Sequence, residues 1–335
     1  MPLRRPRGGR GLCAAAAIAL GLLAGCHQTL DAGYDLPRLL PVGPTNPVII
    51  SQDDWSGDWL GEYAVLLANS GGPPLVGIVI NATSIWGDLD INVSGWNDLV
   101  TAARSSGLKN IPDVTRSTGK PLVRPSNGDI DSTTANNSEG AQRIRDLSRQ
   151  FSQPNLPVAV VSGTSLTDVA DAYLIDHSVV DRVVVVAALG GYNAPNAAMG
   201  APNGDMDPWA DWIVAQRFRY VQACTYYDQT ADVTMANVPY LPQNALGNRF
   251  ATKLPNIINI LQAADQVALL AMAVQGFAVS VIRAAPDTTS AFDASQGPPL
   301  KPDSNGSNWV VTQIAAPLAQ SRLWQMLLDP HTFGS

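Results

Sequence analysis

The segment Pro47-Val48-Ile49-Ile50-Ser51-Gln52-Asp53-Asp54-Trp55-Ser56-Gly57-Asp58 decides how the chain folds. Its first residues, Pro47 to Ile50, form a short apolar run of the kind found in strands buried within parallel sheets. A polar turn with three carboxylates comes next, and a helical pattern through Leu60, Ala64, Leu66 and Leu67 follows it. The segment therefore predicts a strand, an acidic turn and a helix, in that order.

The same alternation continues downstream. Apolar runs predict strands at 75–80, 158–161, 183–187 and 220–223, and helices are expected at 166–174, from 209 and over 257–274. Residues 124–140 and 285–308 are predicted to be long surface loops. Alternating strands and helices favour an α/β fold, with a single domain built on a mostly parallel, Rossmann-like sheet flanked by helices.

In such a sheet, ligands bind at the carboxyl ends of the strands, and the acidic turn lies at one of these ends. The carboxylates of Asp53, Asp54 and Asp58 would repel one another if they were desolvated. A cation removes this conflict, and carboxylate oxygens select calcium or magnesium over softer metals. The turn alone leaves an alternative open, in which Asp58 only caps the helix and the other two side chains are solvated.

The N-terminus has the pattern of an export signal. Basic residues up to Arg10 precede an apolar stretch, Leu12 to Ala24, that is too short to span a bilayer as a mature helix. The stretch ends in Leu23-Ala24-Gly25-Cys26, which resembles a bacterial lipobox and implies lipidation of Cys26. We predict a signal peptide over 1–25, a tether over 26–46 and a domain over 47–335. The alternative is an ordinary signal peptide that ends near a cysteine.

These features predict an exported protein of the bacterial cell envelope, held at the membrane only by its lipid. Removal of 1–25 takes away four of the 21 basic residues and no acidic residue, which changes the formal net charge from −7 to −11. Nucleic-acid binding requires a basic surface and is therefore excluded. The three histidines, His27, His177 and His331, are spread along the chain, which disfavours a catalytic triad or a zinc site.

The acidic turn resembles the nucleoside hydrolase motif D-x-D-P-G-x-D-D, whose third and last positions match Asp53 and Asp58. Asp265, at the start of an apolar helical stretch, falls where that family has its C-terminal His-Asp pair. Between these ends, further segments are similar to the family's motifs and occur in the same order: 75–78, 121–125, 163–168, 183–191 and 203–208.

The resemblance implies a calcium ion bound by Asp53, Asp58, Asp265 and a backbone carbonyl near Gly163. It also implies that Asp53 is the catalytic base, taking a proton from the water that attacks the anomeric carbon. Asn203 is expected to bind a sugar hydroxyl. The expected function is calcium-dependent hydrolysis of N-glycosidic bonds in a nucleoside or related ribosyl compound outside the cytoplasm. Independently of the resemblance, Trp55 beside the acidic turn is a candidate for stacking on a base or sugar.

Four positions depart from the family pattern. Ser51 replaces the first Asp, Gly57 the Asp that grips the ribose 2-hydroxyl, Ala264 the His that protonates the leaving group, and Ala201 a Glu. The Asn that follows the family's second strand has no firm match, since Asn81 and Ser84 both remain possible.

The departures leave room for a second function, a calcium- or sugar-binding surface lipoprotein that does not catalyse. A third class, the solute receptor of a transporter, usually has two hinged lobes, which the sequence pattern does not show. The oligomeric state stays open, with a homo-oligomer possible.

Overall fold

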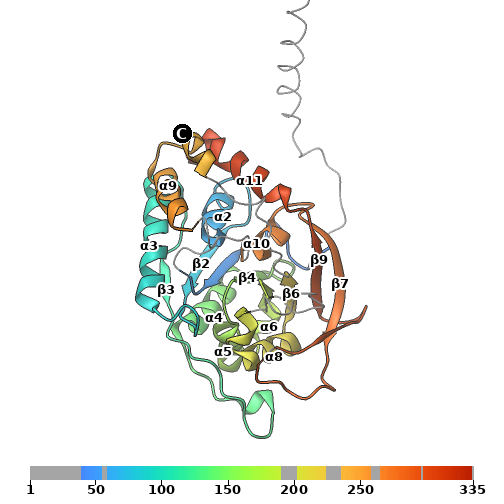
Figure 1. The fold of residues 1–335 in the computed structure, drawn as a ribbon. Coiled ribbons are helices and arrows are strands. Elements are labelled where there is room, and N and C mark those ends of the chain that lie inside the picture. Colours follow the sequence, from blue (N-terminus) through green and yellow to red (C-terminus); the bar gives the residue numbers. More distant parts are fainter. Residues whose placement is uncertain are drawn as a thin grey trace, which may run out of the picture. The chain divides into compact units, whose positions relative to one another are not determined.

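The computed structural model describes residues 39–54, 59–189, 202–223, 235–257, 265–295 and 297–333. These residues form an α/β fold around one nine-stranded sheet, as predicted (Figure 1). The strands are β1 (Val48–Gln52), β2 (Leu75–Ile80), β3 (Val114–Arg116), β4 (Val158–Ser162), β5 (Val183–Ala187), β6 (Arg219–Ala223), β7 (Ala278–Pro286), β8 (Leu300–Pro302) and β9 (Asn308–Ile314).

Helices connect and cover these strands. The α-helices are α2 (Leu60–Leu67), α3 (Leu89–Ser105), α4 (Glu139–Phe151), α5 (Thr167–Ile175), α6 (Val179–Arg182), α7 (Pro202–Asp205), α8 (Pro208–Arg217), α9 (Ala245–Ile257), α10 (Gln266–Ala273) and α11 (Pro317–Leu328). Three short 3-10 helices lie at Ile130–Ser132, Met235–Tyr240 and Pro330–Phe333.

The sheet is parallel except at one edge. Its strand order is β3-β2-β1-β4-β5-β6-β9-β7-β8, and only β7 pairs antiparallel, with β8 and β9. The chain moves from β1 outward through β2 to β3, and then returns to lay β4 on the other side of β1. The strand order therefore reverses between β1 and β4, and an open α/β sheet binds its ligands at such a switch point.

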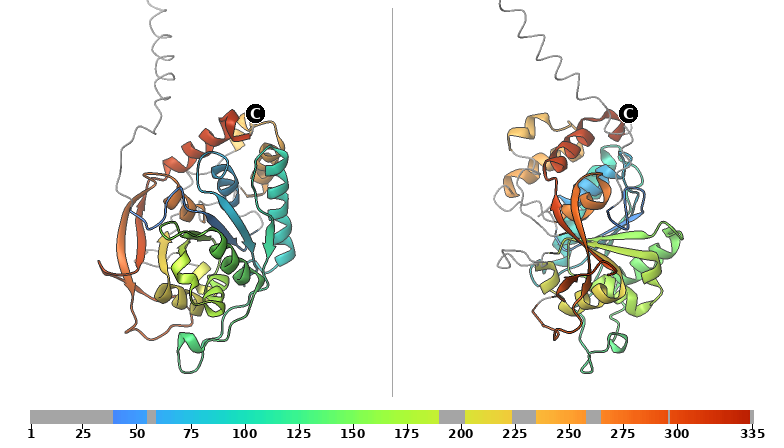
Figure 2. Two further views of the ribbon diagram at one scale, coloured as in Figure 1. Left: turned by 180° about the vertical axis from the view of Figure 1, so that it is seen from behind. Right: turned by 90° about the vertical axis from the view of Figure 1, so that its right-hand side faces the viewer.

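Residues of the central strands alternate between two apolar cores, one on each face of the sheet. Ile50 and Val161 belong to one core, together with residues of α2, α3 and α10. Ile49 and Val160 belong to the other, together with residues of α4, α5 and α8. Figure 2 shows helices on both sides of the sheet. Because β1 and β4 are covered on both faces, continuous apolar runs suit them.

Three predictions about elements need correction. Part of the predicted loop 285–308 is strand, since β7 ends at Pro286 and β8 spans Leu300–Pro302, both paired through backbone hydrogen bonds. Of the predicted helix over 257–274, residues 258–264 lie outside the described ranges, Ile257 ends α9, and α10 spans Gln266–Ala273, so only Asp265 and Val274 are described as non-helical. The predicted tether extends too far, because Leu40 and Val42 are buried in the core and Asn46 donates a hydrogen bond to the Pro157 carbonyl.

No helix in the described ranges is both long and apolar enough to cross a membrane. The predicted signal peptide, Cys26 and most of the predicted tether lie outside those ranges.

Candidate functional site

The candidate site lies at the carboxyl ends of β1 and β4, on either side of the switch point. Ser51 pairs with Ser162 in the parallel register, so Asp53 and Gly163 leave the sheet at about the same level. The backbone N–H of Gly163 donates to the Ser51 carbonyl at 2.9 Å and extends the ladder by one bond. The first predicted ligand, Asp53, is 1% exposed.

The Asp53 carboxylate is fixed by a residue from the neighbouring loop. Thr83, three residues beyond β2, donates its hydroxyl hydrogen to Asp53 Oδ2 at 2.5 Å. The Thr83 oxygen in turn accepts the backbone N–H of Trp86 at 3.2 Å. The orientation of the predicted catalytic base is thus set by a turn of the chain about 30 residues further along.

The Asp265 carboxylate lies beside the same strand end. Gln52 Nε2 donates to Asp265 Oδ2 at 2.7 Å, which joins the last residue of β1 to the residue that precedes α10. A Cβ atom placed on Gly163 would lie 2.6 Å from Cβ, Cγ and Oδ2 of Asp265. Only glycine therefore leaves room for this carboxylate, and the structure brings together Gly163, Asp265 and the residue next to Asp53.

Asn203, predicted to bind a sugar hydroxyl, lies at this site. Its Nδ2 donates to the Ala188 carbonyl at 3.0 Å and to Asp265 Oδ1 at 3.2 Å. Each oxygen of Asp265 thus accepts an amide hydrogen bond, and these bonds help to orient the carboxylate. These contacts make Asn203 a support for the Asp265 carboxylate, and its binding of a sugar hydroxyl stays a prediction.

Several predicted site residues lie outside the described ranges. Asp58 and Trp55 are among them, as are the departures Gly57, Ala264 and Ala201. Within the described ranges, no three His, Cys, Asp or Glu side chains come together as a metal site. The residue types nevertheless suit a hard cation, because Asp53 and Asp265 are buried carboxylates, Gly163 has a backbone carbonyl, and calcium prefers oxygen ligands.

The two candidates for the family's Asn have different surroundings. The Asn81 side chain is buried, accepts the Thr164 hydroxyl at 3.0 Å and donates to Asp168 Oδ2 at 3.4 Å. Ser84 is exposed and lines a cavity. Asn81 thus links the ends of β2 and β4, whereas Ser84 faces the space where a ligand would lie.

Asp168 is a buried carboxyl group that the sequence analysis did not single out as functional. It accepts hydroxyl hydrogen bonds from Ser117 and Ser138, at 2.7 and 2.8 Å, besides the Asn81 amide. Burial raises the pKa of Asp168 above its ordinary value, and these hydrogen bonds oppose that shift. Through these hydrogen bonds, the Asp168 carboxyl group at the start of α5 links the loops after β2 and β3 to the start of α4.

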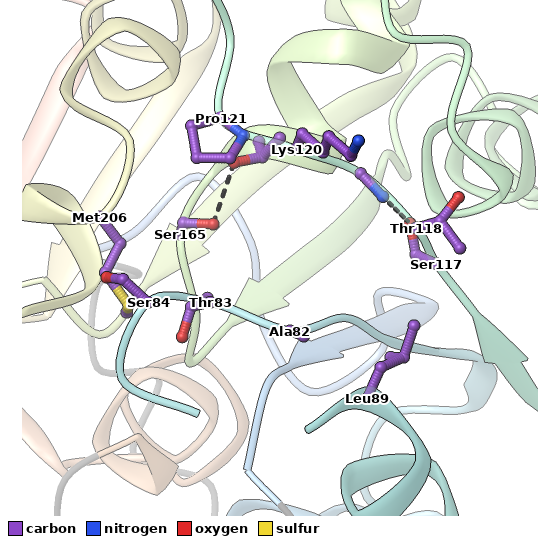
Figure 3. A pocket seen from close by; sticks show the side chains of 12 residues that line it. Ala82, Thr83, Ser84, Leu89, Ser117, Thr118, Lys120, Pro121, Ser165 and Met206 are labelled. Atoms are coloured by element: carbon purple, nitrogen blue, oxygen red, sulfur yellow. Dashed lines mark hydrogen bonds between the residues drawn. The ribbon is translucent and has the colours of Figure 1, made fainter. Parts of the chain in front are cut away.

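A cavity of about 440 Å³ opens next to these residues (Figure 3). Its walls come from the loops after β2 and β3, from the turn after β4 and from Met206. Thr83 belongs both to the cavity wall and to the hydrogen bond with Asp53, so the cavity adjoins the predicted base. Its volume lies in the range of small-molecule sites.

The sheet order, the switch point and the carboxylates placed there define an α/β protein with the nucleoside hydrolase fold. No protein-family model and no curated protein matches the chain. Solved structures do match it, which confirms the fold that the motifs predicted.

An inosine-guanosine nucleoside hydrolase superposes with a TM-score of 0.62 at 14% identity, over 84% of this chain and 99% of that one. The inosine-uridine preferring nucleoside hydrolase from Bacillus anthracis gives 0.60 at 14% identity, over 84% and 98%. The type III effector protein XopQ, complexed with adenosine diphosphate ribose, gives 0.55 at 13% identity, over 86% and 96%.

Gln52 and Thr83 are the site residues that the sequence analysis missed. Gln52 carried a usable signal, because a long polar side chain at the end of a buried apolar strand needs a partner at the site. Thr83 carried none, since its role depends on the path of the loop after β2.

Proposed function

We propose that the protein is a calcium-dependent hydrolase of N-glycosidic bonds in a nucleoside or related ribosyl compound, acting outside the cytoplasm. The observation that carries the proposal is the hydrogen bond from Gln52, the neighbour of Asp53, to Asp265 at the β1–β4 switch point. A cavity of small-molecule size lies beside it, and Thr83 of the cavity wall donates a hydrogen bond to Asp53. The similarity of the fold to enzymes named for nucleoside hydrolysis supports this assignment.

Asp53 is the catalytic base in this proposal. Its carboxylate takes a proton from a water molecule as the water oxygen bonds to the anomeric carbon. The C–N bond breaks at the same time, and its electron pair leaves with the heterocyclic leaving group. Calcium, held by Asp53, Asp58, Asp265 and the Gly163 carbonyl, would polarise and orient that water. Clustered carboxylates also favour the positive charge that develops on the sugar in an oxocarbenium-like transition state.

The leaving group departs without a histidine to protonate it, because Ala264 occupies that position. Substrates whose leaving group needs no proton, such as a nitrophenyl riboside, are therefore the best ones. Gly57 in place of the carboxylate that grips the 2-hydroxyl makes discrimination between ribosides and 2-deoxyribosides weak, because a site without that partner cannot penalise its absence.

The test is release of nitrophenol and of free base from ribosides and 2-deoxyribosides, with calcium and with chelator. Asp53→Asn should lower kcat far more than it changes KM, because the base acts in the transition state. The matched control is Asp113→Asn, since Asp113 is an exposed aspartate paired with Arg104. Release that persists in Asp53→Asn or under chelation contradicts the mechanism.

A second function, calcium or sugar binding without turnover, is favoured by the loss of the acid and the ribose grip at Ala264 and Gly57. It predicts calcium-dependent ribose binding with no product from any member of the panel.

The location outside the cytoplasm follows from the sequence around Cys26. Cys26→Ser should abolish acylation and move the protein from the membrane fraction to the soluble fraction. Mass spectrometry that finds no acyl group on the wild-type protein contradicts the anchor.

A further inference from the structure

Hydroxyl groups are the commonest polar groups in the wall of the cavity beside Asp53. Of the 12 residues that line it, six carry hydroxyl groups, one is a cation, and none is aromatic or acidic. The hydroxyl groups therefore decide which ligand the cavity accepts. Because a hydroxyl has one hydrogen to donate and two lone pairs to accept with, its partners in the protein determine what it presents to a ligand.

The hydrogen of Ser165 is directed away from the cavity by a relay. Thr167 donates its only hydroxyl hydrogen to Asp207 Oδ2 at 2.7 Å. The 3.0 Å bond between the Ser165 and Thr167 hydroxyls must therefore be donated by Ser165. Figure 3 shows this bond as the dashed line at Ser165, whose side chain lies on the wall between Pro121 and Thr83. Ser165 is left with lone pairs toward the cavity.

Other hydroxyls of the wall are committed in the same direction. Thr83 donates to Asp53 at 2.5 Å, and Thr118 donates to Glu139 at 2.8 Å. The backbone N–H of Thr118 also goes to Glu139, at 3.0 Å, and these bonds hold the pKa of Glu139 below its ordinary value, which keeps it an ionised acceptor.

Apart from that of Ser84, the hydroxyls of the described wall therefore give their hydrogens to the protein and can offer a ligand only lone pairs. A phosphate or carboxylate needs donors, and among the described residues that line the cavity the only cationic side chain is that of the exposed Lys120. An amino group of a ligand can donate its N–H hydrogens to these oxygen lone pairs. A carbonyl oxygen in the same place would be repelled, because its own lone pairs would face those of the hydroxyls.

We propose that this cavity holds the leaving group of the substrate and selects an amino-bearing heterocycle, of the cytosine or adenine kind, over its oxo counterpart. This inference rests on the proposed function, because it assumes that the ribosyl part lies at Asp53. It gives the chain the opposite preference to that named for the inosine-uridine preferring enzyme of similar fold.

The experiment measures dissociation constants of the full mature chain in calcium, by calorimetry, with product release followed in parallel. Cytidine is compared with uridine and adenosine with inosine, since each pair exchanges an amino group for an oxygen on the same ribosyl group. Cytidine and adenosine should bind about tenfold more tightly than their partners, the effect of one hydrogen bond gained and one repulsion avoided.

Thr167→Val tests the relay directly. Without the Thr167 oxygen, the Ser165 hydrogen is released toward the cavity, and the amino preference should shrink or invert. Ser165→Ala removes the acceptor and should bring the ratio of the two dissociation constants in each nucleoside pair toward one. The matched control is Thr312→Val, which removes a hydroxyl that bonds to Ser280 on the distant β7–β9 edge and should keep the wild-type ratio.

Uridine and inosine binding as tightly as their amino partners in the wild-type protein overturns the inference alone. Failure of all four nucleosides to bind overturns the proposed function and the inference with it. If Thr167→Val does not fold, the ratio of dissociation constants in the wild-type protein and its change in Ser165→Ala still test the inference.

Discussion

Thr83 lines the cavity and also donates a hydrogen bond to the Asp53 carboxylate. Its hydroxyl holds one oxygen of Asp53, and the backbone N–H of Trp86 holds the hydroxyl. Such a hydrogen bond to a charged group fixes the direction of the carboxylate more than it adds to substrate affinity. Thr83 is therefore a positioning residue for the proposed base.

Thr83→Val should lower kcat by about tenfold or more and leave KM little changed, because a lost hydrogen bond to a carboxylate costs about 1.5 to 3 kcal/mol. Valine keeps the shape of threonine. Thr83→Ser restores the hydroxyl and should recover most of the rate. A valine variant as fast as wild type, together with a slow serine variant, would show that the site needs the methyl group and not the hydrogen bond.

Asp211, on α8, is a buried acid outside the proposed site. Its Oδ1 accepts the Tyr220 hydroxyl at 3.2 Å, while burial first, and then the nearby Asp207 and Asp205, raise the pKa of Asp211 to about 7. The folded state therefore holds this proton more tightly than the unfolded chain does. Stability from this group is fully present below the unfolded pKa of 3.8 and is lost as the pH rises through about 7.

The free energy of unfolding should therefore fall between pH 5 and pH 7 by about 2 kcal/mol through Asp211 alone. Asp211→Asn keeps an acceptor for Tyr220 and removes the titration, so its stability should fall less over this interval. The measurement is urea unfolding of both proteins at the two pH values. Parallel curves would exclude Asp211 as the source.

At the scale of elements, the connection between β7 and β8 does more than join two strands. It packs Phe292 against Trp209 and Trp212 of α8, with ring centroids 5.4 and 5.7 Å apart. Gly297 lies so close that a Cβ atom there would be 1.7 Å from Asp211 Oδ2. The connection therefore covers α8 and contributes to the burial of its acid.

Gly297→Ala should destabilise the fold by about 1 to 3 kcal/mol, because the added methyl group forces this connection away from α8. Gly71→Ala is the control for crowding: Gly71 has no heavy atom within 4 Å of an added Cβ, although its φ of 77° adds a backbone cost of its own. Thermal unfolding of both variants, compared with wild type, gives the result. A Gly297→Ala protein as stable as wild type would contradict the packing argument.

The elements that the sequence predicted correctly are those whose pattern depends on burial alone. β1, β4 and β5 are buried along their whole length, and each is an apolar or nearly apolar run. Only Ala278 and Ala284 of the nine residues of β7 are buried, and its partner β8 is only three residues long, so neither stands out in the sequence. α4 was missed because its mean character is polar and only one stripe, including Ile144 and Leu147, is buried.

The candidate site was predictable where motif and strand end coincide, as at Asp53, Gly163 and Asp265. Those three were placed by resemblance, and the structure sets Gly163 and Asp265 in contact at the end of β1. The partners that orient them, Gln52 and Thr83, depend on which strands become neighbours. That information lies in tertiary packing and not in any local pattern.

At the scale of the whole molecule, calcium is expected to bind only the folded chain, because its proposed ligands lie on segments far apart in sequence. Calcium at about 100 times its dissociation constant should stabilise the protein by roughly 2.7 kcal/mol. Asp58→Ala should abolish this gain, whereas Asp113→Asn should keep it. An unchanged melting temperature with saturating calcium and with chelator would contradict the metal site.

The hydrogen bond between Gln52 and Asp265 spans 213 positions of the chain. A polypeptide that emerges from the ribosome N-terminus first makes β1 early, but it cannot close this bond until α10 has also been made and has docked. Contacts of such long range form late and slowly, since the intervening chain must first give up its freedom. The proposed cation site therefore forms only late in folding, after Asp265 and the helix that follows it have been synthesised and have docked.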